Sequence, residues 1–177
     1  CGKIDYPDEI LNQRLSVRYN ANRFTGTNFE NSGSASAAEH TGNSLVTTDN
    51  VVASHTWILG NTAVLDSRVG WTRDNEPGQA NSTAPEAVIR QAGNNVLSIG
   101  RNNFSPRYTN AKTWQWVETL AKTSGRHSFK FGSDMNFQSI ANFFPGNFSG
   151  SYTFNSYADF AANRPFSFTQ AFAGEGT

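Results

Sequence analysis

The sequence has little of what disulfide-linked domains and helical membrane proteins depend on. Its 177 residues include one cysteine, Cys1, so no intrachain disulfide can form. No stretch approaches the ~20 consecutive apolar residues of a membrane-spanning helix, which excludes a helical membrane protein. A membrane β-barrel is not excluded, because its signal is alternation of apolar and polar residues rather than an apolar run.

Charge is also scarce, and it is balanced. Charged residues make up 16% of the chain, well below the ~25% of an ordinary soluble domain. The 14 basic residues equal the 14 acidic ones, whereas a nucleic-acid-binding domain usually carries a basic surplus. The polar character comes instead from 20 Asn, 18 Ser and 16 Thr. We therefore expect no nucleic-acid partner.

Residue patterns that carry catalysis are missing as well. His40, His55 and His127 are far apart and show no metal-ligand spacing. His40 follows Glu39 in a polar stretch, where solvation is the expected state. Cys1 has no neighbouring histidine or acid to activate it as a nucleophile. We predict no catalytic residue, no metal and no cofactor, and hence a protein that is not an enzyme.

What the sequence does contain is period-two alternation, the signature of half-buried β-strands. In the clearest segment, 128–137, Phe and Met residues alternate with Lys130, Asp134 and Asn136. The other segments with this character are Leu15–Asn22 and Ala63–Thr72, the noisier Leu45–Leu59 and Lys112–Ala121, and two short runs at Gly150–Phe154 and near Phe166. In Lys112–Ala121 the pattern is blurred because Glu118 shares a face with two tryptophans.

Two kinds of connection join these segments. Residues 59–62 and 123–127 are short and contain Gly, which is typical of hairpin turns. Residues 25–43 and 73–110 are long, polar and rich in Gly, Asn, Ser and Pro. Outer-membrane barrels combine short turns on one side with long loops on the other. The predicted fold is all-β: an antiparallel up-and-down meander forming part of an outer-membrane β-barrel, with short turns alternating with long polar loops.

In such a barrel, the polar residues of each alternating strand face the interior. Seven residues are expected there: Arg18, Asn20, Asp66, Arg68, Lys130, Asp134 and Asn136. The surplus of ten Arg over four Lys suits this surface, because Arg forms bidentate pairs in half-buried polar places. Contact with a ligand and hydrogen bonding within the protein both remain possible roles.

Several motifs, taken in order, resemble TonB-dependent outer-membrane receptors. Gly125–Asp134 (GRHSFKFGSD) is similar to a strand of that family in which a Gly-x-His turn opens a Lys-Phe-Gly-x-Asp run. The segment 142–154 resembles the loop and strand that follow, and 156–165 resembles an Ala-Asp-Phe turn before an Asn-Arg-Pro step. Residues 99–107 look like a loop of the Oar-like subgroup, whose members often carry a carboxypeptidase-regulatory-like domain.

The resemblance implies that residues 1–177 are a partial β-barrel, since the family closes its barrel with about 22 strands. A plug domain, a TonB box and C-terminal strands are absent from this sequence. By resemblance, the parent protein would lie in the outer membrane of a Gram-negative bacterium and import a scarce extracellular ligand. Its partners would be outer-membrane lipid, the plug and remaining strands, the TonB complex and the unknown ligand. The seven polar residues would contact the plug or the ligand.

A second hypothesis comes from a different class of protein. The alternating segments could instead form the core of a soluble or cell-surface β-rich module that binds a ligand or assembles into fibres by strand addition. Cys1 followed by Gly2 could then be a lipid-modified N-terminus. A plug upstream and further strands downstream would favour the receptor, whereas a lipidation signal before Cys1 would favour the module.

Overall fold

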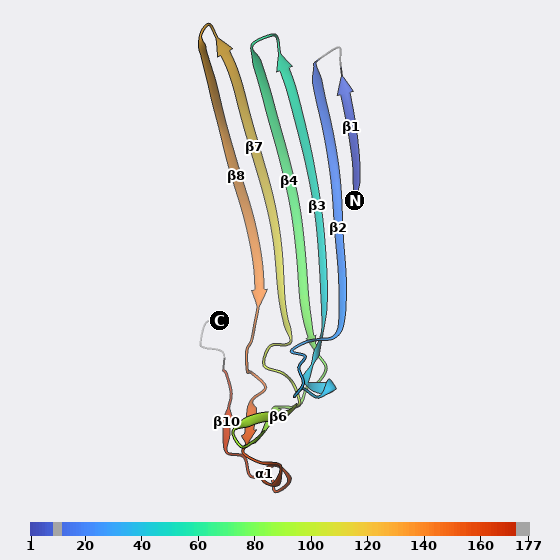
Figure 1. Ribbon diagram of the computed structural model, residues 1–177, viewed down its shortest axis with the longest axis vertical. Coiled ribbons are helices and arrows are strands. Elements are labelled where there is room, and N and C mark those ends of the chain that lie inside the picture. Colours follow the sequence, from blue (N-terminus) through green and yellow to red (C-terminus); the bar gives the residue numbers. More distant parts are fainter. Residues whose placement is uncertain (9–11, 173–177) are drawn as a thin grey trace. The chain divides into compact units, whose positions relative to one another are not determined.

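The computed structural model describes residues 1–8 and 12–172. This part of the chain contains ten strands, one short α-helix and a 3-10 turn at Ala38–His40 (Figure 1). The strands are β1 (Gly2–Asp8), β2 (Gln13–Glu30), β3 (Gly42–Leu59), β4 (Ala63–Ala80), β5 (Glu86–Gln91), β6 (Asn94–Ile99), β7 (Arg107–Ser124), β8 (His127–Phe143), β9 (Ser151–Phe154) and β10 (Ser167–Thr169). The helix is α1 (Tyr157–Ala161). In this part, no helix is long and apolar enough to cross a membrane.

Six strands form an antiparallel sheet in the order β1-β2-β3-β4-β7-β8. The β1–β2 register runs from the Gly2–Tyr19 pair to the Asp8–Gln13 pair. Residues 60–62 join β3 to β4, and residues 125–126 join β7 to β8, so both predicted hairpins are confirmed. The predicted antiparallel meander is therefore present, and it forms from the segments whose apolar and polar residues alternate.

The long segments 25–43 and 73–110 are not entirely loops, which corrects the prediction. β2 continues to Glu30, β4 continues to Ala80, and β5 and β6 lie wholly within the second segment. Propensity alone disfavours strand here, because Gly and Pro interrupt it. Backbone pairing with neighbouring strands overrides propensity. At Gly42 a Cβ atom would collide with the Gln79 carbonyl, so this close approach requires glycine.

The two short runs predicted near the C-terminus are strands, but they do not continue the meander. β9 and β10 belong to a separate four-stranded sheet of order β10-β9-β5-β6. Within it, β5 and β9 pair in parallel, from Glu86–Ser151 to Ile89–Phe154. Ala87, Ile89 and Phe154 are buried and form a small core. The segment expected to be an Ala-Asp-Phe turn forms α1, whose N-cap is Ser156.

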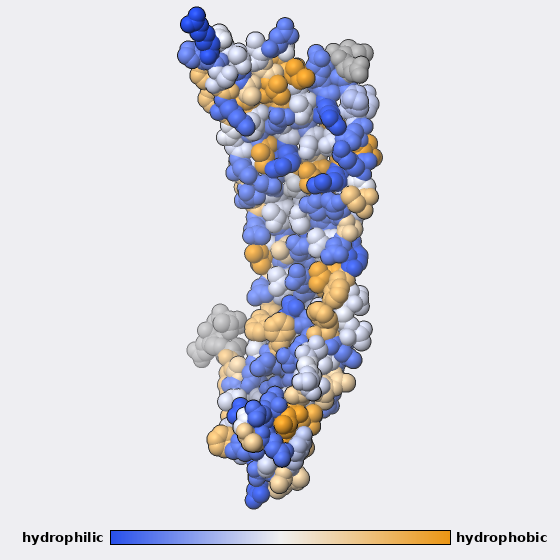
Figure 2. Space-filling model, viewed as in Figure 1, coloured by the Kyte–Doolittle hydropathy of each residue, from blue (hydrophilic) through white to orange (hydrophobic). Residues whose placement is uncertain are grey.

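The contacts divide the chain into two units. We call residues 1–23, 47–75 and 110–141 the strand unit, and residues 24–46, 76–109 and 142–177 the connection unit. Every buried residue of the described chain lies in the connection unit, including its core and nine polar or charged residues. The strand unit keeps its side chains exposed or half-buried. On the face visible in Figure 2, hydrophobic residues are scattered among hydrophilic ones.

Candidate functional site

One face of the strand unit is polar and contains a recess. Arg18 on β2 and Arg68 on β4 both line this recess, whose volume is about 460 Å³. Lys3, Asn50 and Gln115 contribute from β1, β3 and β7. Residues two apart along a strand point to the same side, which explains why Ser16 lies with Arg18 and Ser54 with Asn50 on this face. The recess presents amide groups and cations to whatever occupies that side of the sheet.

Amide side chains link neighbouring strands across the same face. The Asn20 side-chain amide donates to the side-chain oxygen Oδ1 of Asn50 at 3.3 Å, and the Asn50 side-chain amide donates to the Thr72 hydroxyl at 2.8 Å. Nearer the β3–β4 hairpin, the Thr56 hydroxyl donates to Asp66 at 2.6 Å. Cross-strand polar pairs of this kind stabilise a sheet by a few tenths of a kcal/mol to about 1 kcal/mol each.

A second polar group lies on β7 and β8. The Gln115 amide donates to both oxygens of Asp134, at 3.0 and 3.1 Å. Asn136 donates to the same carboxylate at 3.2 Å. Lys130 is exposed and shares this face by alternation along β8. The carboxylate of Asp134 is thus hydrogen-bonded by two neighbouring amides, while Lys130 is exposed.

All seven residues predicted to face a barrel interior therefore lie on one side of the sheet. The structure brings Arg18 and Arg68 to one recess and Asp134 next to Asn136, but it does not gather the seven into a single pocket. Sequence reasoning missed Asn50 and Gln115, which join the predicted residues. They lie on β3 and β7, where the alternation is noisier. Assigning every second residue of these two strands to the polar face would have found them.

The opposite face of the strand unit is aromatic. The rings of Trp71 and Trp114 lie 6.4 Å apart on β4 and β7, and those of Phe129 and Phe131 are stacked at 6.3 Å on β8. These side chains are exposed or half-buried, so the sheet offers no protein core to them. A sheet with one polar and one aromatic face, both left exposed or half-buried by the described residues, matches a barrel wall between water and lipid.

Glu118 breaks this pattern, as its sequence position indicated. It lies on the aromatic face, where its carboxylate accepts from the Ser67 hydroxyl at 2.8 Å and from the Trp116 indole N–H at 3.1 Å. An acid among apolar side chains costs free energy unless its oxygens are hydrogen-bonded. Two donors, one for each oxygen, reduce that cost.

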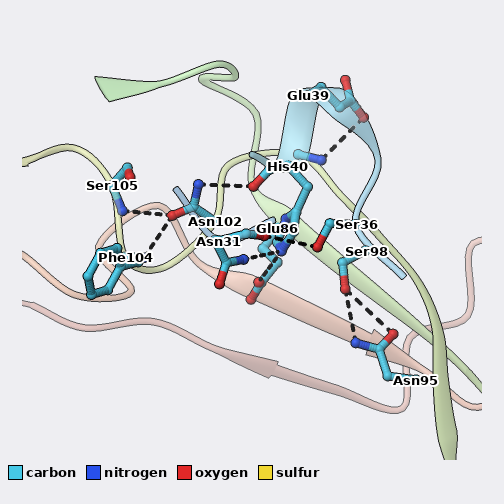
Figure 3. Close-up of polar contacts among 11 residues, drawn as sticks. Asn31, Ser36, Glu39, His40, Glu86, Asn95, Ser98, Asn102, Phe104 and Ser105 are labelled. Atoms are coloured by element: carbon cyan, nitrogen blue, oxygen red, sulfur yellow. Dashed lines mark hydrogen bonds and ion pairs between the residues drawn. The ribbon is translucent and has the colours of Figure 1, made fainter. Parts of the chain in front are cut away.

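The connection unit contains a buried polar cluster around His40 (Figure 3). His40 is 3% exposed, which corrects the expectation that it is solvated. Its Nε2 lies 2.9 Å from the Asn31 amide nitrogen and 3.5 Å from the Glu86 carboxylate. Of these two partners, Asn31 is nine residues from His40 in the sequence, whereas Glu86 lies far away in the sequence, on β5. No local pattern could have revealed this environment.

Asn102 organises the same cluster. Its side-chain amide donates to the His40 carbonyl at 2.9 Å, and its oxygen accepts from the backbone N–H groups of Phe104 and Ser105 (Figure 3). Nearby, buried Glu30 forms a bidentate pair with Arg107, whose guanidinium also covers the Phe104 ring. These contacts fix long connecting segments in one conformation. Within residues 1–8 and 12–172, no group of three or more His, Cys, Asp or Glu side chains could hold a metal ion.

The comparisons with known proteins agree with this geometry. A family model described as an outer membrane beta barrel domain matches residues 3–176. No curated protein and no solved structure matches the chain. The match covers nearly the whole chain, and the two-faced antiparallel sheet is the structure that such a domain requires. The chain belongs to the outer-membrane β-barrel domain family, which places it in the outer membrane.

Proposed function

We propose that the chain is a barrel segment of a TonB-dependent, Oar-like receptor that binds and imports a scarce extracellular ligand. The observation that carries this proposal is the polar face of the strand unit. Arg18, Arg68 and Lys130 lie on it and have no ion pair within the described residues. Cations facing a barrel interior need acidic or polar partners. A plug domain or an anionic ligand supplies them in a receptor of this type.

The two edge strands of the sheet are further evidence for a larger parent barrel. Among the described residues, β1 and β8 each have one neighbouring strand. Unpaired backbone N–H and C=O groups are not tolerated in hydrocarbon, because each costs several kcal/mol. We propose that further strands of the parent chain pair with both edges. The connection unit, with its small core and buried polar cluster, then forms the outward-facing segments that contact the ligand.

The first test is the intact mass of the native polypeptide, taken from an outer-membrane fraction. A receptor would have a mass several times the 19.4 kDa of this chain. A mass near 19.4 kDa would contradict the proposal. Binding of the purified protein to the periplasmic domain of TonB then tests whether TonB supplies the energy for import. Failure to bind, with and without an extract of the growth medium, would contradict TonB dependence.

The second test asks which side of the sheet faces the protein interior. A photo-crosslinking amino acid replaces Arg68 in one variant of the native protein and its neighbour Val69 in another. We expect position 68 to link to a plug segment of the same polypeptide and position 69 to link to lipid. Lipid adducts at position 68 would contradict the proposed orientation of the faces.

A further inference from the structure

Two cations lie side by side on the aromatic face of the strand unit. Trp71 and Trp114 contact each other across β4 and β7. In an antiparallel pair, the next residues on the same face are two positions further on one strand and two positions back on the other, which are Arg73 and Lys112. Both are exposed, and both line one recess of about 310 Å³.

The described residues balance these two charges only in part. Like charges directly opposite each other destabilise a sheet, and neither residue has an ion pair within the described residues. Asp49 interacts electrostatically with Arg73, but its carboxylate already accepts from Tyr19 and Arg23. Asp74 also borders the recess, although alternation along β4 directs its side chain to the polar face.

The rest of the recess suits an anion with several oxygens. Asn75, Asn110 and Ser139 line it together with the two cations, and they offer amide and hydroxyl donors. Oxygens of a phosphate group accept hydrogen bonds from Arg and Lys most strongly, because both partners are charged. A phosphate group would also relieve the repulsion between Arg73 and Lys112.

The position along the strands indicates the source of the phosphate. Arg73 is ten residues from the hairpin end of β4 at Ala63, and Lys112 is twelve residues from the hairpin end of β7 at Ser124. At ~3.3 Å per residue and a tilt of ~45°, this is about 23–28 Å along the membrane normal. The apolar band of such barrels is about 25 Å tall, with short turns on the periplasmic side. The cations therefore lie at the level of the outer-leaflet headgroups.

We propose that Arg73 and Lys112 form a binding site for the phosphorylated headgroup of an outer-leaflet lipid, whose acyl chains pack over Trp71 and Trp114. The inference rests on the part of the proposed function that turns the aromatic face toward lipid. It is independent of the ligand that the receptor imports and of TonB. Bound lipid would seal the barrel wall at this point.

The experiment measures lipid association with the native outer-membrane protein in detergent micelles by native mass spectrometry. The probe is a bisphosphorylated diglucosamine lipid, compared with its dephosphorylated form. We expect the double variant Arg73→Gln/Lys112→Gln to bind the phosphorylated probe about thirtyfold more weakly, since each basic residue near an anionic headgroup contributes roughly fivefold. The charge-preserving variant Arg73→Lys/Lys112→Arg should retain most of the binding.

The matched control is Arg68→Gln/Lys130→Gln, which removes one Arg and one Lys from the polar face. Its lipid binding should equal that of the unmodified protein. If this control loses binding and the Arg73/Lys112 variant does not, the assignment of the faces is wrong. If neither variant changes binding, or if millimolar inorganic phosphate displaces the probe, the site is not a lipid headgroup site although the receptor proposal stands. Retention of the heat-modifiable gel shift checks that each variant is folded.

Discussion

The strand unit and the connection unit both satisfy their backbone hydrogen bonds with β-sheets, but they differ in how far their side chains are buried. All fully buried residues of the described chain are in the connection unit. The strand unit has one aromatic and one polar face, and the side chains described on both are exposed or half-buried. We therefore expect the connection unit to be stabilised by its own buried contacts, and the strand unit to depend more on the surrounding lipid.

The largest expected effect comes from the buried ion pair of the connection unit. Arg107→Met leaves the Glu30 carboxylate buried without its cation, which should lower the free energy of unfolding of this unit by about 3–5 kcal/mol. Hydrogen exchange should then accelerate in the connection unit and not in the strand unit. The exposed pair provides the control, because Arg164→Met removes the partner of Asp159 at a cost of about 0–1 kcal/mol. Equal effects of the two variants would contradict the comparison.

The second prediction concerns the two faces of the strand unit. Met135→Arg places a charge on the aromatic face of β8 and should destabilise the lipid-inserted protein by about 2–4 kcal/mol. Asn136→Arg, one residue further along, places the same charge on the polar face and should cost much less. Urea unfolding of the native protein in lipid vesicles, followed by tryptophan fluorescence, measures both. A similar loss in the two variants would mean that the faces do not meet different environments.

A smaller effect is expected at the start of α1. The Ser156 hydroxyl accepts from the Asp159 N–H at 3.0 Å, so it satisfies one of the free N–H groups of the helix. Ser156→Ala should destabilise the connection unit by about 1 kcal/mol, and Ser156→Asn should recover most of the loss. Protease susceptibility near residues 157–161 is the readout. Unchanged susceptibility of the Ala variant would show that the cap contributes nothing.

The smallest effect is expected for an exposed ion pair of the strand unit. Lys3 lies 2.8 Å from Asp5 on β1, and their side chains are 51% and 35% exposed. Lys3→Gln should leave the urea midpoint of unfolding almost unchanged, because water and salt screen such pairs. The same urea experiment measures it, at low and at high salt. A clear, salt-independent drop of the midpoint would mean that β1 lies in a less polar environment than the exposure of these side chains indicates.

Alternation predicted the centres of the long strands but not their ends. Segments 15–22 and 128–137 alternate cleanly and lie inside β2 and β8, and the two Gly-containing turns are hairpins. The strand conformation of Pro77 and Gly78, by contrast, results from pairing with strands that are distant in the sequence. A Cβ atom at Gly78 would lie 3.1 Å from Arg107 Cγ and 3.2 Å from Glu30 Cδ, a proximity that only the folded chain creates.

The sequence by itself determined the two-faced strands and the side on which Arg18, Arg68 and Asp134 lie, because a period of two fixes the face of every side chain once a strand forms. Only the tertiary structure decided which residues meet across strands. The opposition of Arg73 and Lys112, the recess between Arg18 and Arg68, and the burial of His40 beside Glu86 all depend on register and long-range pairing. Register and long-range pairing depend on interactions over the whole sheet, which no local sequence pattern predicts.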